Sequence, residues 1–173
     1  MDSQAVHGNQ FSDPVTPEAV RLVMRQWTTG VTVVTSRWGD AQHGMTVSSF
    51  TSISLDPPLV SISLAQEART HHLVEKSRLF GVTILGEIQQ EISDRFAGRI
   101  ADSDDRFAGL ESFTLVSGVP FLVGGLACLD CQVVSRLEAG RNTVFLGKVI
   151  AVNLGNGGPP LLYYDRSYQK ICD

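Results

Sequence analysis

The sequence predicts a mainly β protein, built as a barrel or closed sheet with a few flanking α-helices. Segments rich in β-branched or alternating apolar residues outnumber those with helical periodicity. Most connections between the predicted strands are too short for the helical crossovers that a doubly wound parallel sheet requires. The chain has 173 residues, the usual length of one domain, and no repeat or linker divides it.

The N-terminal part predicts a tail followed by a helix. Residues 1–13 are polar and are expected to form a flexible tail, which leaves residues 14–173 for the folded domain. Thr16 and Pro17 suit the N-cap and the first position of a helix that ends near residues 28–30. Apolar residues then recur at the spacing of one helical face and predict a buried stripe. The stripe consists of Val20, Val23, Met24 and Trp27.

The remainder of the chain predicts mostly strands. Two more helices are expected, at residues 70–76 and 87–96, and the second of these carries apolar residues at helical spacing. The glycine- and proline-rich residues 155–160 indicate a turn. The strands are expected at residues 31–35, 44–55, 59–64, 79–85, 113–116, 126–137, 143–154 and 161–164.

The predicted strand at residues 44–55 changes its alternation part of the way along. Its apolar residues fall at Met45 and Val47, and then at Phe50. A period-2 pattern that slips in this way predicts a bulge or bend near Ser48 and Ser49. Backbone N–H groups leave the ladder at such a bend, so a ring with hydrogen-bonding edges or a phosphate is a suitable ligand. A surface strand rich in Ser and Thr is the alternative interpretation.

Composition and charge narrow the classes of protein. Charged residues make up 18% of the chain, against about 25% in a typical protein, which leaves apolar surface for a subunit interface. The net charge of −4, without a Lys/Arg cluster, argues against nucleic-acid binding. No apolar run approaches the ~20 residues of a membrane span. The polar N-terminus and the few cysteines predict a reduced, cytoplasmic protein.

Cys128 and Cys131 have C-x-x-C spacing, which is a weak signal when it occurs once. Zinc sites usually need four ligands, and the sequence holds no second pair. In a strand, positions i and i+3 point to opposite faces, so the two thiols should not meet. We therefore expect both to pack in the core, and no metal site is predicted.

Several motifs occur in an order that identifies a known family. The most distinctive is GMTVSSF at residues 44–50, followed by SLDPPLV at residues 54–60. Further motifs lie at residues 29–35, 77–85, 95–98, 105–109, 118–131 and 160–164. Together they resemble the flavin reductase-like family, the FMN-binding split barrels that include reductase components of two-component flavin monooxygenases. The resemblance extends over residues 17–170.

The resemblance implies an FMN-binding split β-barrel and a homodimer with the flavin near the subunit interface. The flavin ring would lie along residues 46–50, and its phosphate beside the residues after the third strand. Arg69 suits a bidentate phosphate contact. The flavin-binding residues implied are Thr32, Thr46, Val47, Ser48, Ser49, Phe50, Ser63, Arg69, Thr70 and Phe96.

The implied activity is NAD(P)H-dependent flavin reduction. Hydride passes from NADH or NADPH to FMN or FAD, and the protein supplies stacking geometry rather than an acid or a base. No catalytic side chain is therefore predicted. The reduced flavin would serve a separate flavin-dependent monooxygenase.

The chain departs from the family at the Gly-Asp-His motif on the nicotinamide side of the site, to which Tyr168 is also assigned. The corresponding residues are Gly140, Arg141 and Asn142. Asn forms hydrogen bonds but carries no charge, and Arg141 is positive where the family has an acid. Two interpretations remain open. Either Arg141 attracts the anionic dinucleotide and alters cofactor preference, or the nicotinamide site is lost and flavin is bound for another redox, binding or sensor role.

Overall fold

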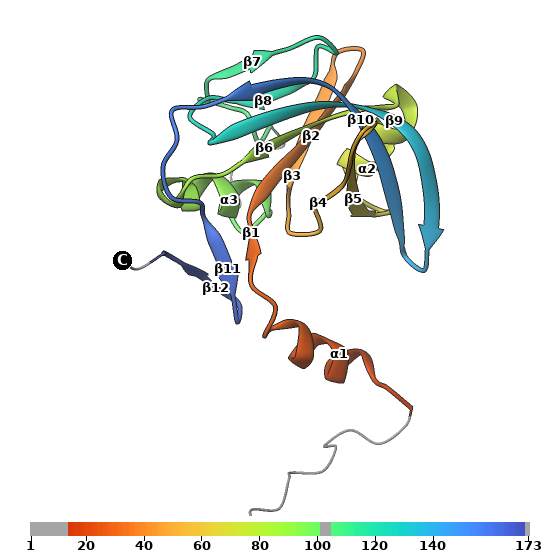
Figure 1. Ribbon diagram of the computed structural model, residues 1–173, viewed down its shortest axis with the longest axis vertical. Coiled ribbons are helices and arrows are strands. Elements are labelled where there is room, and N and C mark those ends of the chain that lie inside the picture. Colours follow the sequence, from red (N-terminus) through yellow and green to blue (C-terminus); the bar gives the residue numbers. More distant parts are fainter. Residues whose placement is uncertain (1–13, 101–104, 172–173) are drawn as a thin grey trace, which may run out of the picture.

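The computed structural model describes residues 14–100 and 105–171, so the predicted tail at residues 1–13 lies outside the described residues. Its main feature is a seven-stranded antiparallel sheet in the order β3-β2-β6-β9-β10-β5-β4 (Figure 1). The mainly β prediction is confirmed. The strands are β2 (Thr32–Trp38), β3 (Ala41–Val47), β4 (Thr51–Leu55), β5 (Pro58–Ala65), β6 (Leu79–Ile84), β9 (Ala127–Ala139) and β10 (Asn142–Leu154).

The two edge strands of this sheet, β3 and β4, are consecutive in the chain. Residues 48–50 therefore lead from one edge of the sheet to the other, as a curled sheet requires. The Ser49 hydroxyl donates to the Ser63 carbonyl at 2.9 Å and accepts from the Ser63 N–H at 3.0 Å. The strand expected at residues 44–55 is thus two strands, and the break falls where the alternation slips.

Two smaller sheets complete the β structure. One contains β1 (Thr29–Gly30), β11 (Leu162–Tyr164) and β12 (Ser167–Gln169), and the other pairs β7 (Ser112–Thr114) with β8 (Pro120–Leu122). The sequence indicates β7 and β11 as parts of the strands expected at residues 113–116 and 161–164. It does not indicate β1, β8 and β12, which are two or three residues long.

Two helices pack on the barrel close to β3. They are α2 (Arg69–Ser77) and α3 (Gln90–Phe96), and a 3-10 turn, η1 (Glu87–Gln89), precedes α3. Phe96 is fully buried over Gly44, where an added Cβ would lie 2.7 Å from the Phe96 ring. Ile88, which the helical spacing in residues 87–96 places on one stripe with Phe96, is 87% exposed because it lies in η1, before the α-helical period begins.

The barrel interior holds the largest apolar cluster. Phe80 and Phe145 are both fully buried in it, and an added Cβ at Gly147 would meet the Phe80 ring at 2.4 Å. Cys131 belongs to this cluster and Cys128 to another, so the expectation that the two thiols pack apart in the core is confirmed. Burial raises the pKa of both thiols, that of Cys131 to about 12.

Helix α1 (Pro17–Met24) projects from the barrel (Figure 1). It begins as expected, with the Thr16 hydroxyl accepting from the Ala19 N–H at 3.2 Å. It ends at Met24, earlier than expected, and Trp27 lies beyond it. The prediction of a buried stripe is wrong for this chain: Ala19 alone is buried among the residues of α1, while Val23 is 62% and Trp27 67% exposed. The spacing defines an apolar face, but no described segment of the chain covers it.

A search of the described residues finds no helix that is long and apolar enough to cross a membrane.

Candidate functional site

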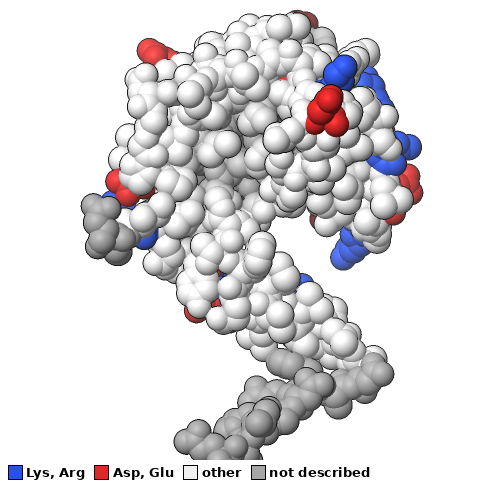
Figure 2. Space-filling view, in the orientation of Figure 1, with Lys and Arg blue, Asp and Glu red and all other residues white. Residues whose placement is uncertain are grey.

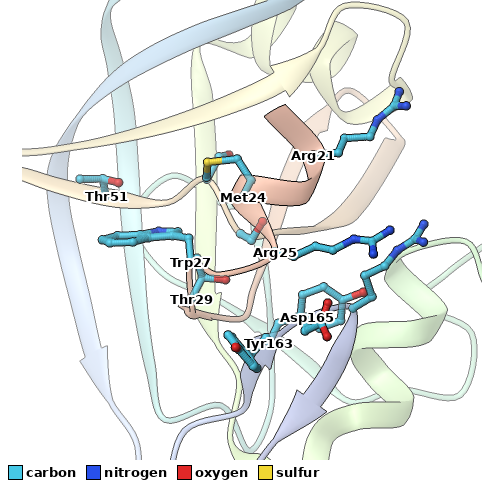
Figure 3. Close-up of a pocket in the computed structure, with 12 residues that line it drawn as sticks. Arg21, Met24, Arg25, Trp27, Thr29, Thr51, Tyr163 and Asp165 are labelled. Atoms are coloured by element: carbon cyan, nitrogen blue, oxygen red, sulfur yellow. The ribbon is translucent and has the colours of Figure 1, made fainter. Parts of the chain in front are cut away.

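Two adjoining cavities lie where β3 breaks off from β4. The larger, about 550 Å³, lies between α1, residues 48–51 and the β11–β12 hairpin (Figure 3). The smaller, about 170 Å³, lies between the end of β3, α3 and β12. Ser48 and Tyr163 line both cavities, so the two form one continuous site beside the predicted bend.

Of the sequence-predicted segment from Thr46 to Phe50, residues 46–49 form the barrel side of this site. The Thr32 hydroxyl donates to the Val47 carbonyl at 2.8 Å and fixes the end of β3. The Thr46 hydroxyl donates to the Ser93 carbonyl at 2.6 Å, which joins the strand to α3. Ser48 and Ser49 follow the strand and are exposed, while Phe50 packs partly into the core. Thr32 therefore positions the segment through this hydrogen bond and does not itself line either cavity.

A cluster of aromatic and charged side chains forms the opposite wall of the smaller cavity. The Arg99 guanidinium lies 5.7 Å from the ring centre of Tyr163 and 5.8 Å from that of Tyr168. It also pairs with Asp94 at 2.9 Å. The Tyr168 hydroxyl donates to the Asp94 carboxylate at 2.8 Å and lies 2.8 Å from the Ser93 hydroxyl. Burial, as the largest cause, raises the Tyr168 pKa, so its hydroxyl keeps its proton at neutral pH.

The predicted phosphate-side residues lie at the end of β5 and the start of α2. Ser63 is held by Ser49, and Arg69 is exposed at the first position of α2. Thr70 is fully buried, and its hydroxyl lies 2.8 Å from Nδ1 of His43. Burial, with the charges of Arg106 and Arg69, lowers the His43 pKa to about 4, so His43 is neutral at pH 7.

The departure from the Gly-Asp-His motif lies at the tip of the β9–β10 hairpin. Gly140 adopts φ +63°, and the Arg141 carbonyl accepts from the Gln66 N–H at 3.0 Å. Asn142 pairs with Ala65 on the neighbouring strand. The turn is thus joined to the connection between β5 and α2, next to the phosphate-side residues. Tyr168, also assigned to the nicotinamide side, lines the smaller cavity.

Nine predicted residues line neither of the two cavities, and several cavity residues were not predicted. The nine are Thr32, Phe50, Ser63, Arg69, Thr70, Phe96, Gly140, Arg141 and Asn142. In the described part of the chain Phe96 is buried against Phe107, with ring centres 5.2 Å apart, and lines neither cavity. Trp27, assigned to a buried stripe, lines the larger cavity. No local signal identifies its other unpredicted residues, because α1 and the β11–β12 hairpin meet only in the folded chain. They are Arg21, Met24, Arg25, Thr29, Thr51, Asp165 and Arg166.

The donor set of this site suits a flavin. Trp27 and Tyr163 offer aromatic surface, and Ser48 and Ser49 offer hydroxyls and backbone groups outside the strand ladder. A volume of about 550 Å³ lies within the usual ~300–1,000 Å³ of ligand pockets. A planar ring with one hydrogen-bonding edge matches this combination of aromatic faces and polar groups.

Comparisons with known proteins define the class to which this fold and site belong. A model of the flavin reductase like domain matches residues 24–172. An NADH-dependent flavin reductase of Rhodococcus is 37% identical over 163 residues, which cover 92% of this chain and 89% of the relative. The reductase component of 4-hydroxyphenylacetate 3-monooxygenase from Thermus thermophilus is 34% identical over 154 residues, covering 89% and 96%.

Solved structures share the fold. The NADH:FAD oxidoreductase of Streptomyces globisporus superposes with a TM-score of 0.86 at 31% identity, covering 98% of this chain and 95% of that one. A flavin reductase named PheA2 gives 0.84 at 32% identity, covering 92% and 100%. The architecture is therefore that of flavin reductases. The chain belongs to the flavin reductase-like family, as its motifs indicate.

Proposed function

We propose that the protein is an NAD(P)H-dependent flavin reductase that passes hydride to FMN or FAD and supplies reduced flavin to a separate monooxygenase. The observation that carries this proposal is the aromatic-lined cavity at the break between β3 and β4, which contains Ser48 and Ser49 of the family motif. Relatives that are named as reductase components of monooxygenases support the proposal that a separate monooxygenase is the partner.

The residues of the chain bind and orient the reactants. Flavin, when bound, supplies the hydride-accepting ring, so the chain needs no acid or base of its own. Ser48 and Ser49 would hold the polar edge of the ring, and Tyr163 would limit its position from the other side. On the phosphate side Arg69 supplies charge, while Ser63 and Thr70 belong to the framework that positions it.

The direct test is anaerobic addition of NADH or NADPH to protein loaded with FMN or FAD. We expect the yellow flavin absorbance to bleach with at least one nicotinamide. If it persists with both while flavin stays bound, the reductase proposal is wrong and a flavin-binding role without nicotinamide turnover remains. Stopped-flow measurement of the Arg141→Asp/Asn142→His variant then shows whether the departure from the motif slows hydride transfer, because restoring the motif should raise the rate.

The proposal includes a homodimer whose interface contains α1. Val20, Val23 and Met24 are all about half exposed or more, and on β4 Ile53 is 53% and Leu55 90% exposed. Figure 2 shows few charges on the barrel surface above α1. Exposed apolar residues gathered on a surface element often mark an interface. Met24 also lines the larger cavity, which would bring the flavin close to the second copy.

A cytoplasmic location also belongs to this proposal. Cys128 and Cys131 are buried and, within the described residues, both are free thiols. Free thiols are typical of reducing compartments. The nicotinamide cofactors that the reaction needs are cytoplasmic metabolites, and a fractionation experiment would test the location.

A further inference from the structure

Three arginines line the larger cavity on the side of α1 and the β11–β12 hairpin. Arg21 and Arg25 come from α1 and its C-cap, and Arg166 from the hairpin turn. Arg21 pairs with Glu18 at 3.1 Å, but both groups are more than 70% exposed, so the pair is weak. Arg25 and Arg166 form no ion pair with any described residue. Asp165 is the acidic residue lining the same cavity, so positive charge predominates there.

The two helical arginines occupy a face of α1 distinct from the apolar stripe. Arg21 and Arg25 are four residues apart and therefore lie on the same side of the helix. Figure 3 shows both side chains extending away from Trp27. A second copy covering the apolar stripe would leave this basic face available to a ligand in the cavity.

Arg166 has a left-handed backbone conformation, which is unfavourable for a residue other than glycine. Asp165 and Arg166 adopt φ +42° and +64° between the paired residues Tyr164 and Ser167, so two non-glycine residues form a left-handed turn. Two-residue hairpins with this geometry prefer Asn-Gly or Asp-Gly. Residues held in such conformations concentrate at functional sites. A helix C-terminus attracts cations, which accounts for Arg21 and Arg25, but it does not account for an arginine in this turn.

Hydrogen bonds fix the turn against α1. The Asp165 N–H donates to the Arg25 carbonyl at 3.1 Å, and the Tyr164 hydroxyl donates to the Gln26 side chain at 3.0 Å. The three guanidinium groups are therefore carried by two elements that are joined to each other. The arrangement is built by tertiary contacts and is not a chance alignment of surface side chains.

We propose that Arg21, Arg25 and Arg166 bind the pyrophosphate of an adenine dinucleotide whose reactive ring lies in the cavity that contains Ser48 and Ser49. The inference rests on the proposed function, because the same cavity contains both serines and the three arginines. Planar guanidinium groups bind phosphate oxygens in pairs, and several of them match a diphosphate. Two dinucleotides carry this group, FAD and the nicotinamide dinucleotide. FAD bound in this way would have its pyrophosphate at the three arginines and not at Arg69, whereas the nicotinamide dinucleotide would leave Arg69 to the phosphate of FMN. Arg21 precedes the segment that matches the family model, residues 24–172.

The decisive variant is Arg166→Gly, which removes the cation and relieves the left-handed backbone. The matched control is Arg78→Gly: Arg78 has φ +60° at the end of α2, and it is not among the residues that line the described cavities. Because glycine suits both positions, both variants should keep or raise the melting temperature, by about 2 °C. A loss of binding in Arg166→Gly then cannot come from unfolding.

The measurement is equilibrium binding of FMN, FAD and, to FMN-loaded protein, NAD⁺, followed by flavin fluorescence and calorimetry. We expect Arg166→Gly to weaken FAD or NAD⁺ binding about tenfold and to leave FMN unchanged, since FMN lacks a pyrophosphate. If Arg166→Gly weakens the binding of FAD alone, the site binds the flavin dinucleotide. If it weakens the binding of NAD⁺ alone, the site binds the nicotinamide dinucleotide. Either result supports the proposal. The control should bind all three normally.

Two outcomes would overturn the inference. One is that FAD and NAD⁺ both bind Arg166→Gly within twofold of the parent protein. The other is that FMN binding weakens as much as dinucleotide binding, which would indicate a distorted cavity. Failure of the parent protein to bind any flavin would instead refute the proposed function, so the two failures are distinguishable.

Discussion

The barrel and the α1 region differ in how their apolar residues are used. In the barrel, alternate residues of β5 such as Val60, Ile62 and Leu64 are buried within the same chain. In α1 a comparable apolar stripe faces outward, and two hydrogen bonds, from Asp165 to Arg25 and from Tyr164 to Gln26, connect this region to the β11–β12 hairpin. The barrel therefore buries its apolar residues within the chain, while the α1 region leaves apolar and basic surface exposed, which we propose serves ligand and partner.

The largest effect on stability should come from the barrel core. Phe80→Ala removes a fully buried ring that packs against Gly147, and we expect the free energy of unfolding to fall by about 3–5 kcal/mol. Urea unfolding measures this. Leu55→Ala is the control: Leu55 is 90% exposed, and its loss should change the free energy by about 0.5 kcal/mol or less in the isolated chain. A loss below about 1 kcal/mol for Phe80→Ala would contradict the assignment of stability to the barrel.

Local patterns predict the barrel well because alternation is a property of each strand. The long strands β9 and β10 lie within two residues of their expected bounds. The slipped alternation at Ser48 and Ser49 also locates the break between β3 and β4. The same reasoning fails for α1, because periodicity identifies an apolar face but does not say what covers it.

The site is only partly predictable from the sequence. Ser48 and Ser49 belong to a continuous motif that the sequence alone reveals, and both line the larger cavity. Arg25 and Arg166 are 141 positions apart and come together through the contact between Asp165 and Arg25. No rule based on the spacing of residues in the sequence predicts such a contact. Phe96 shows the opposite case, since a recognisable motif contains a residue that the fold uses in its core.

The second prediction concerns how the stability of the protein depends on pH through His43, which lies in strand β3 of the barrel. The His43 pKa is about 4 in the folded chain and 6.5 in the unfolded one, so between these values the unfolded chain binds more protons. Stability should therefore be fully present above pH 6.5 and fall by up to about 3 kcal/mol as pH drops to 4. Urea unfolding of His43→Asn at pH 7 and 4.5 should show a smaller difference than the parent protein. His72→Asn, at an exposed position, should leave the difference unchanged.

A smaller effect is expected at the junction between the barrel and the C-terminal hairpin. Tyr168→Phe removes the hydroxyl that bonds Ser93 and Asp94, and we expect a loss of about 1 kcal/mol in the free energy of unfolding. Flavin binding should weaken as well, because Tyr168 lines the smaller cavity. Tyr164→Phe removes a hydroxyl bonded to Gln26 and tests the α1 contact separately. Normal stability and binding in Tyr168→Phe would show that this hydroxyl does not support the site.

The smallest effect on the barrel is expected from α1, where a substitution should act on assembly alone. Val23→Asp places a charge on the exposed apolar stripe. In sedimentation we expect this variant to be a monomer and the parent protein to be a dimer. Leu22→Asp is the matched control, because Leu22 is 45% exposed but lies outside the stripe, on another side of the helix. Neither change should alter the free energy of unfolding of the isolated chain by more than about 0.5 kcal/mol. If Val23→Asp leaves a dimer intact, the stripe is not the interface. If it unfolds the barrel, the division between a self-sufficient barrel and an α1 region made for binding is wrong.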